Sequence, residues 1–286
     1  MLAIIFAFIS YLGWGIGDIL GAQTSRKIGG YSFSLYLSVI GLILSSFYIP
    51  FALADLNKFT LESLIIIIIL TFLGPIPLVA FYEGLRVGNA AVVGTIASSF
   101  ALVTVLLSII FLGEKISLGQ SIFISIIFLG IILSSLNLRQ LKNKNILLDR
   151  GIPYAIVAML LWGVYFTFIK IPIKQIGWFW PGYLTWLSFP IILIVMQVKR
   201  IKLIKPDKRV FIPLLLAALL INIGGISYNL AISEGLVSLV APIASSSVTL
   251  FVFLAFLIFK DPITKQQVVG VVTTLIGIVL LSIFSI

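Results

Sequence analysis

The chain has 286 residues, of which 61% are hydrophobic and only 10% are charged. Soluble domains average about 45–50% apolar and about 25% charged residues, so this composition excludes a soluble fold around one core. The net charge of +10 would fit nucleic acid, but the basic residues lie between apolar runs, and we predict no nucleic-acid partner. With no Cys and no His, the sequence excludes disulfides, thiol nucleophiles and Cys/His metal sites.

Apolar runs follow one another along the whole chain, beginning at Met1 without the charged segment of a cleavable signal peptide. A helix needs about 20 residues to cross the hydrocarbon core, and the runs are too continuously apolar for barrel strands. We therefore predict an all-α integral membrane protein with ten transmembrane helices. These cover residues 2–22, 33–53, 63–85, 90–112, 118–136, 152–171, 180–198, 210–232, 236–259 and 266–285.

The basic residues are unevenly divided between the loops. Loops after even-numbered spans contain only Lys58, Lys115, Lys170 and Lys174, and the other basic residues follow odd-numbered spans. The positive-inside rule then places the odd-numbered loops in the cytoplasm and both termini outside. We predict a multi-pass protein of the plasma membrane.

The two halves of the sequence resemble each other at a nearly constant offset of 147 or 148 residues. The matching landmarks are Trp14-Gly15 with Trp162-Gly163, Ile96-Ala97-Ser98-Ser99 with Ile243-Ala244-Ser245-Ser246, Gln120 with Gln267, and Gly130 with Gly277. Because each half has five spans, an odd number, the second half enters the membrane from the opposite side. We predict a first repeat at 1–136, a basic linker at 137–151 and an inverted second repeat at 152–286.

The same residues resemble the drug/metabolite transporter superfamily, specifically its ten-helix EamA-type members. The pattern is Trp14-Gly15 in the first helix, Leu112-Gly113-Glu114 after the fourth, and then Ser117, Gln120 and Gly130. The second copy has Trp162-Gly163, Thr264, Gln267 and Gly277, and departs from the pattern at Lys260-Asp261-Pro262. The resemblance covers nearly the whole chain and is uninformative about substrate.

This resemblance implies a central cavity lined mainly by helices 1, 3, 4, 6, 8 and 9, with helices 5 and 10 as scaffold. It also implies alternating access without ATP, in which one half rocks against the other. A small-molecule substrate and membrane lipid are the expected partners, a monomer is the expected functional unit, and no cofactor is expected.

Asp18 is the acid of greatest interest, because an ionisable group within a span is by default a functional hypothesis. Tyr11, Trp14 and Asp18 share one helix face, whereas Gly13, Gly17 and Gly21 form a small-residue ridge for close packing. Since hydrocarbon favours a neutral carboxyl group, Asp18 is a candidate proton-coupling residue. The alternative is an interfacial carboxylate paired with Arg26 or Lys27.

Two further charged residues lie near span ends. Glu83 is a candidate for the substrate pathway, but an i,i+3 pair with Arg86 would explain both residues without a ligand. Lys170 could pair with substrate, or its amino group could reach the interface, as lysines at span ends usually do. We expect Glu114-Lys115 and Asp261 to be interfacial or structural.

The remaining candidates for the substrate pathway are polar or aromatic residues within spans. For each, helix packing or interfacial anchoring is the alternative to substrate contact. They are Tyr82, Tyr228, Trp162, Tyr165, Asn222, Asn229 and the serine pairs Ser98-Ser99 and Ser245-Ser246. Gly74-Pro75-Ile76-Pro77 and Pro242 are expected to kink their helices.

The sequence contains no catalytic constellation, because it lacks His, a phosphate-binding loop and a second acid facing Asp18 within a span. We therefore expect a secondary transporter and not an enzyme. Export of amino-acid-like or amphipathic compounds is the favoured hypothesis. An uptake facilitator for a sugar or other neutral solute, and a non-transporting protein such as a lipid scramblase or a partner-binding subunit, are the alternatives.

Overall fold

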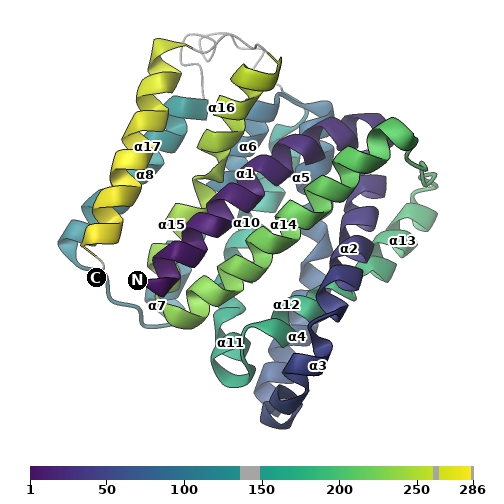
Figure 1. The fold of residues 1–286 in the computed structure, drawn as a ribbon, viewed down its shortest axis with the longest axis horizontal. Helices are drawn as coiled ribbons and strands as arrows, with labels where there is room; N and C mark the ends of the chain where they lie inside the picture. Colours follow the sequence, from purple (N-terminus) through teal and green to yellow (C-terminus); the bar gives the residue numbers. More distant parts are fainter. Residues whose placement is uncertain (136–148, 260–263, 285–286) are drawn as a thin grey trace.

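The fold comes from a computed structural model, which describes residues 1–135, 149–259 and 264–284 (Figure 1). Every regular element in these ranges is a helix, as expected for a backbone that must satisfy its own hydrogen bonds in lipid. The elements are α1 (Leu2–Ile28), α2 (Gly30–Ser46), α3 (Ile49–Ala52), η1 (Leu53–Lys58), α4 (Leu61–Leu73), α5 (Pro75–Val87), α6 (Ala90–Ser98), α7 (Phe100–Phe111), α8 (Leu118–Ser135), α10 (Ile152–Phe168), α11 (Lys170–Ile176), α12 (Phe179–Trp186), α13 (Phe189–Val198), α14 (Lys208–Glu234), α15 (Val237–Ser245), α16 (Ser247–Phe259) and α17 (Lys265–Ile283).

Among the described residues, eight helical segments are long and apolar enough to cross a membrane, or nine if one bent pair counts as a span. The segment Leu118–Ser134 is apolar but shorter. The chain is therefore a multi-pass helical membrane protein. Several expected limits were too narrow, since α1 continues to Ile28 and carries Arg26 and Lys27 in its last turn.

The span expected at 33–53 is bent in the structure. Helix α2 ends at Ser46, and the following helical stretch, Ile49–Lys58, is turned by 64° from it. Pro50 lies in the first turn of α3, where its missing N–H costs nothing, but inside a continuous helix it would remove a hydrogen bond. The proline therefore explains why a new helix begins there.

Other long segments are interrupted within the bundle. The segment Leu61–Val87 divides into α4 and α5 at Gly74, directly before Pro75, and the kink expected there stays a prediction. Pro242 lies inside α15, and a break between α15 and α16 follows four residues later, at Ser246. A corresponding break separates α6 from α7 at Ser99, so both serine pairs mark interruptions of a long helical segment.

The small-residue ridge on α1 packs where the sequence predicted a close helix contact. A β-carbon at Gly13 would lie 2.7 Å from the carbonyl oxygen of Leu220, and one at Gly17 would lie 2.6 Å from the Ile221 side chain. Both contacts are with α14, which runs beside α1 (Figure 1). At Gly21 the neighbours are instead the rings of Phe33 and Tyr82.

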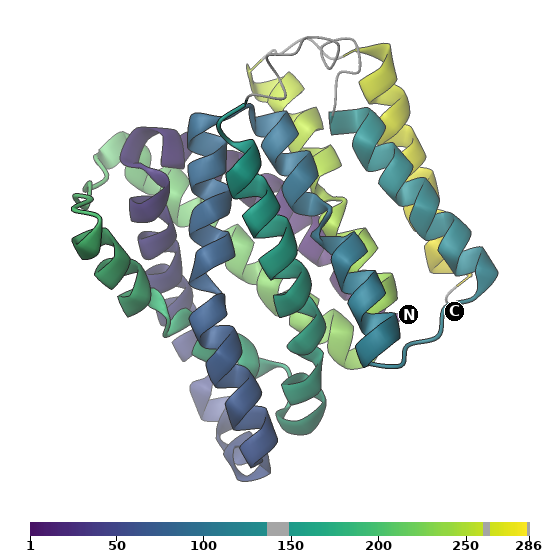
Figure 2. The same cartoon turned by 180° about the vertical axis from the view of Figure 1, so that it is seen from behind.

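Helices α8 and α17 pack mainly against each other at one edge of the molecule (Figure 2). Each begins with a reciprocal cap. Ser117 Oγ accepts from the Gln120 N–H at 3.2 Å and the Gln120 side chain accepts from the Ser117 N–H at 2.9 Å, and Thr264 and Gln267 form the same arrangement. The repeated hydroxyl-x-x-Gln pattern therefore starts two scaffold helices. Residues 137–148, Lys260, Asp261 and Pro262, named in the sequence-based predictions, lie outside the described residues.

The glycine ridge gives a test of this packing. Gly13→Ala should lower the melting temperature of the purified protein, by the equivalent of about 1–3 kcal/mol, because the added methyl group meets backbone atoms of α14. Gly225→Ala is the matched control, since a β-carbon there meets nothing within 4 Å. Equal melting temperatures for the two variants would contradict the close α1–α14 contact.

Candidate functional site

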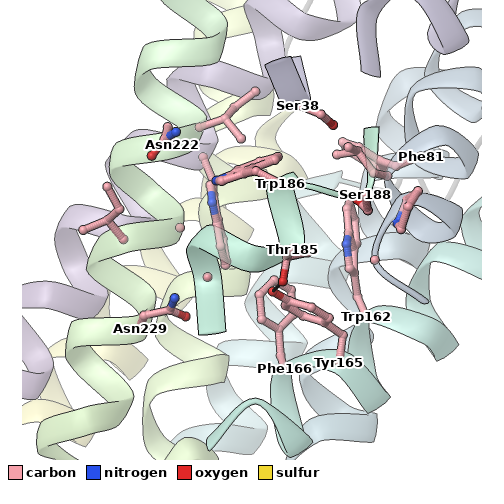
Figure 3. Close-up of a pocket in the computed structure, with 18 of the residues that line it drawn as sticks. Ser38, Phe81, Trp162, Tyr165, Phe166, Thr185, Trp186, Ser188, Asn222 and Asn229 are labelled. Carbon is pink, nitrogen blue, oxygen red and sulfur yellow. Dashed lines mark hydrogen bonds between the residues drawn. The ribbon is translucent and has the colours of Figure 1, made fainter. Parts of the chain in front are cut away.

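A cavity of about 160 Å³ lies between the helices of the bundle (Figure 3). Its wall is built by α1, α2, α5, α6, α7, α10, α12, α14 and α16 and by residues at the helix breaks. Of the residues predicted from the sequence, the wall includes Trp14, Asp18, Tyr82, Ser98, Trp162, Tyr165, Asn222 and Asn229.

Aromatic rings form much of this wall. Trp14 packs against Phe166 with ring centroids 5.3 Å apart, and Phe81 packs against Trp162 at 5.1 Å. Phe100 lies between these groups, 6.3 Å from Trp14 and 6.1 Å from Trp162. The ring contacts hold the tryptophans of α1 and α10 in place. The cavity therefore presents flat, rigid apolar surfaces to whatever enters it.

Asp18 supplies the carboxylate of the wall. Its Oδ1 atom accepts a hydrogen bond from the Tyr82 hydroxyl at 2.7 Å, and Tyr82 is almost completely buried against Phe33. Among the described residues Asp18 forms no ion pair with Arg26 or Lys27, and Arg26 instead donates to the Leu85 carbonyl oxygen at 3.3 Å. Asp18 also lies further from its helix end than expected, since α1 continues for ten more residues, to Ile28.

Two amides on α14 line the cavity and connect helices at the same time (Figure 3). Asn222 donates from Nδ2 to the Gly41 carbonyl oxygen at 3.0 Å, and its Oδ1 accepts from Ser45 Oγ at 3.5 Å. Asn229 donates to the Trp178 carbonyl oxygen at 3.3 Å. Helix bridging and a place in the wall were alternatives in the sequence, and the structure combines them.

The structure places seven predicted residues outside the wall. The hydroxyl groups of Ser99, Ser245 and Ser246 donate hydrogen bonds to backbone carbonyl oxygens three or four residues earlier in the chain. The Oγ–O distances are 3.0, 3.2 and 2.5 Å. Tyr11 pairs with Thr249 at 3.5 Å. Tyr228 lies behind the wall, between Trp14 and Phe166, and its hydroxyl has no hydrogen-bond partner among the described residues.

Glu83, the sixth of these residues, caps the start of α2. Its Oε1 accepts from the Gly30 N–H at 2.7 Å and from the Tyr31 N–H at 3.3 Å. Its Oε2 forms the predicted i,i+3 pair with Arg86 at 2.7 Å. A buried carboxylate that satisfies free N–H groups at a helix start has a structural role.

Lys170, the seventh, is buried, and its amino group has backbone partners inside the protein. Its Nζ donates to the carbonyl oxygens of Ile232 and Gly235, where α14 ends, the latter at 2.7 Å. Glu114 binds the next helix start, accepting from the N–H groups of Val237 and Ser238 at 2.8 Å each. The two side chains thus hold the α14–α15 junction from both sides, which agrees with a structural role for Glu114.

The sequence analysis did not predict every part of the cavity wall. The helices listed from the family resemblance omit the second and seventh spans, but α2 contributes Ser38 and Ser45, and the segment around α12 contributes Tyr183, Thr185, Trp186 and Ser188. Tyr165 on α10 is joined to Thr185 by a hydrogen bond of 3.0 Å. The density of aromatic and hydroxyl residues at 178–188 was the available signal.

Comparisons with known proteins agree with this architecture. The model of the EamA-like transporter family matches residues 1–136 and 149–283. The chain is 31% identical over 93 residues to the uncharacterized protein MJ1333.1 of Methanocaldococcus jannaschii, covering 32% of this chain and 68% of that protein. A solved crystal structure superimposes with a TM-score of 0.78 at 11% identity, over 99% of this chain and 97% of the other, which shows a shared fold.

A helical bundle with many membrane-crossing segments and a polar-aromatic cavity between them has the form of a membrane transporter. With the family model matching both halves, the chain belongs to the EamA-like transporter family of the drug/metabolite transporter superfamily. Members of this family are transporters and not enzymes.

The α14–α15 junction gives a second test. Glu114→Gln should lower the melting temperature, by the equivalent of about 1–3 kcal/mol, because an amide cannot accept from both N–H groups as a carboxylate does. The neighbouring exposed residue provides the control, Lys115→Gln, which should leave the melting temperature unchanged. A Glu114→Gln protein as stable as the wild type would show that this cap contributes little.

Proposed function

We propose that this protein is a secondary transporter that moves small amphipathic compounds, amines in particular, through the central cavity by alternating access. The observation that carries the proposal is the composition of the wall. Within the described part of the chain, Asp18 is the only charged residue of the wall, and it lies among aromatic rings. A carboxylate favours an ammonium group, and tryptophan faces add cation–π attraction.

This wall favours amphipathic amines over free amino acids. An amino acid also carries a carboxylate, which needs a cationic or N–H partner when it leaves water. No Lys or Arg belongs to the wall as far as the structure describes it. Export, the direction favoured from the sequence, remains part of the proposal.

A ten-span organisation with two inverted five-helix repeats, 1–136 and 152–286 joined by the linker 137–151, is also part of the proposal. Three features support it: the double match of the family model, the breaks at Ser99 and Ser246, and the paired caps that begin α8 and α17. Such repeats place the substrate between the halves and allow one half to rock against the other. We expect a monomer to be sufficient.

The repeats differ where the chemistry is proposed to occur. The offset that matches Trp14 with Trp162 also places Phe166 at the position of Asp18. Tyr82 therefore meets a carboxylate, whereas its counterpart Tyr228 meets the Phe166 ring at 4.7 Å. Among the described residues, only the first half then carries a carboxyl group in the wall. This supports proton coupling through Asp18, because a proton and an ammonium group can compete for one carboxylate.

The proposed location is the plasma membrane, with the more basic ends of the helices in the cytoplasm. The described residues at these ends include Arg26, Lys27, Arg86, Lys199 and Arg200, whereas α1 begins and α17 ends at the other end (Figure 1). The positive-inside rule supports this orientation.

Ligand binding to the purified protein tests the substrate class. Amphipathic amines should raise the melting temperature and quench tryptophan fluorescence, because a ligand that binds only the folded state stabilises it. Size-matched neutral alcohols and zwitterionic amino acids are the controls. A shift with sugars alone would favour the neutral-solute facilitator, for which Asn222, Asn229 and the serines would supply the hydrogen bonds.

Transport in proteoliposomes tests coupling. For an amine identified by binding, a proton gradient should drive wild-type transport, and Asp18→Asn should abolish that response because the amide cannot exchange a proton. Asp55→Asn is the matched control, since Asp55 pairs with Lys58 outside the cavity wall. Unchanged gradient-driven transport in Asp18→Asn would refute the coupling, and lipid scrambling without solute transport would refute the transporter proposal.

A further inference from the structure

A second hollow, of about 390 Å³, lies on the outside of the bundle between α5, α10 and α13. We call it the lateral groove. Its apolar lining includes Ile76 and Val79 of α5, Val157 of α10, and Ile192 and Val195 of α13. Ile76 is 50% and Val157 40% exposed. In a membrane-spanning protein such apolar, exposed side chains face acyl chains.

One end of the lateral groove is polar. Tyr31, Tyr154 and Lys199 line it there, at the start of α2, the start of α10 and the end of α13. Lys199 Nζ donates to the Tyr31 hydroxyl at 3.0 Å and lies 5.6 Å from the centre of that ring. Because Tyr31 accepts this bond, its own proton can be donated to a further acceptor, beside an ammonium group.

The positive charge of Lys199 at this end is not neutralised by the nearby carboxylate of Glu83. Glu83 interacts electrostatically with Lys199, but its carboxylate already binds Arg86 and the N–H groups at the start of α2. Along the chain Lys199 is followed by Arg200 and Lys202. The polar end therefore has a cationic excess that fits an anion.

The dimensions of the groove fit an acyl chain below that anion. Ile191, which also lines the groove, precedes Lys199 by eight positions, or about 12 Å along a helix axis. A ligand that satisfies the whole groove must therefore combine an anionic head at the membrane surface with an apolar tail that extends into the hydrocarbon.

We propose that the lateral groove is a binding site for an anionic glycerophospholipid, with the phosphate on Lys199 and Tyr31 and one acyl chain along α5, α10 and α13. Basic pockets between membrane helices suit anionic head groups, and aromatic residues suit the interface. Pro75 lines both the lateral groove and the central cavity, so the acyl chain rests against the wall that separates it from the substrate.

Native mass spectrometry of the full-length protein, with phosphatidylglycerol and phosphatidylcholine supplied in equal amounts, tests the proposal. The wild type should retain one phosphatidylglycerol in preference to phosphatidylcholine. Lys199→Gln should reduce that retention about fivefold, because one basic residue near the surface contributes about 1 kcal/mol to anionic-lipid binding. Lys205→Gln, which removes an exposed charge of the same loop outside the groove lining, should change nothing.

A second variant tests the acyl-chain part without altering charge. Val157→Trp should fill the groove and displace the retained lipid, and melting temperatures of all variants establish that they are folded. The proposal is overturned by equal retention of the two lipids in the wild type, or by a Val157→Trp protein that retains phosphatidylglycerol. It is also overturned if Lys205→Gln acts as strongly as Lys199→Gln, or if glycerol 1-phosphate displaces the lipid at equal concentration, which would indicate a site for free phosphate.

Discussion

A backbone in hydrocarbon must find its hydrogen-bond partners inside the protein, and the organisation of this molecule follows from how it meets that constraint at helix breaks. A continuous helix satisfies its own backbone hydrogen bonds, but a break leaves N–H and carbonyl groups without partners in the helix. Glu83 binds the N–H groups that begin α2, Glu114 binds those that begin α15, and Lys170 binds the carbonyls that end α14. Charged side chains that suggest substrate chemistry in a sequence thus stabilise the breaks that the cavity requires.

The same constraint separates the polar groups that belong to the scaffold from those of the cavity. Ser99, Ser245 and Ser246 bond to their own helices, so little of their hydrogen-bonding capacity remains. In the described part of the chain Asp18 instead has a single hydrogen-bond partner, the Tyr82 hydroxyl, and its carboxylate borders the cavity. A group with one exchangeable partner can respond to a ligand, whereas the caps cannot be removed without exposing backbone. This difference makes Asp18 the natural centre of the proposed transport chemistry.

The bundle also organises its outer surface. Helix α5 borders the central cavity on one side and the lateral groove on the other, and Pro75, at its start, belongs to both. Helices α8 and α17 stand apart from both hollows and pack mainly on each other, as expected for scaffold (Figure 2). The lipid-facing and substrate-facing surfaces are therefore one helix apart, which links the proposed lipid site to the proposed pathway.

The membrane class, most of the spans and the glycine ridge could be predicted from the sequence, because hydropathy and small-residue spacing act locally along one helix. The family could be predicted from the repeated motifs. Eight residues of the wall could also be predicted, because polar groups within spans are costly unless they face a cavity or a partner, and aromatic residues lie on the same helix faces. Which of these residues contact one another became clear from the packed helices. The Asp18–Tyr82 pair, the burial of Lys170 and the contribution of α2 and α12 to the wall join residues far apart in the chain, and their contacts depend on helix rotation and packing, which local patterns do not specify.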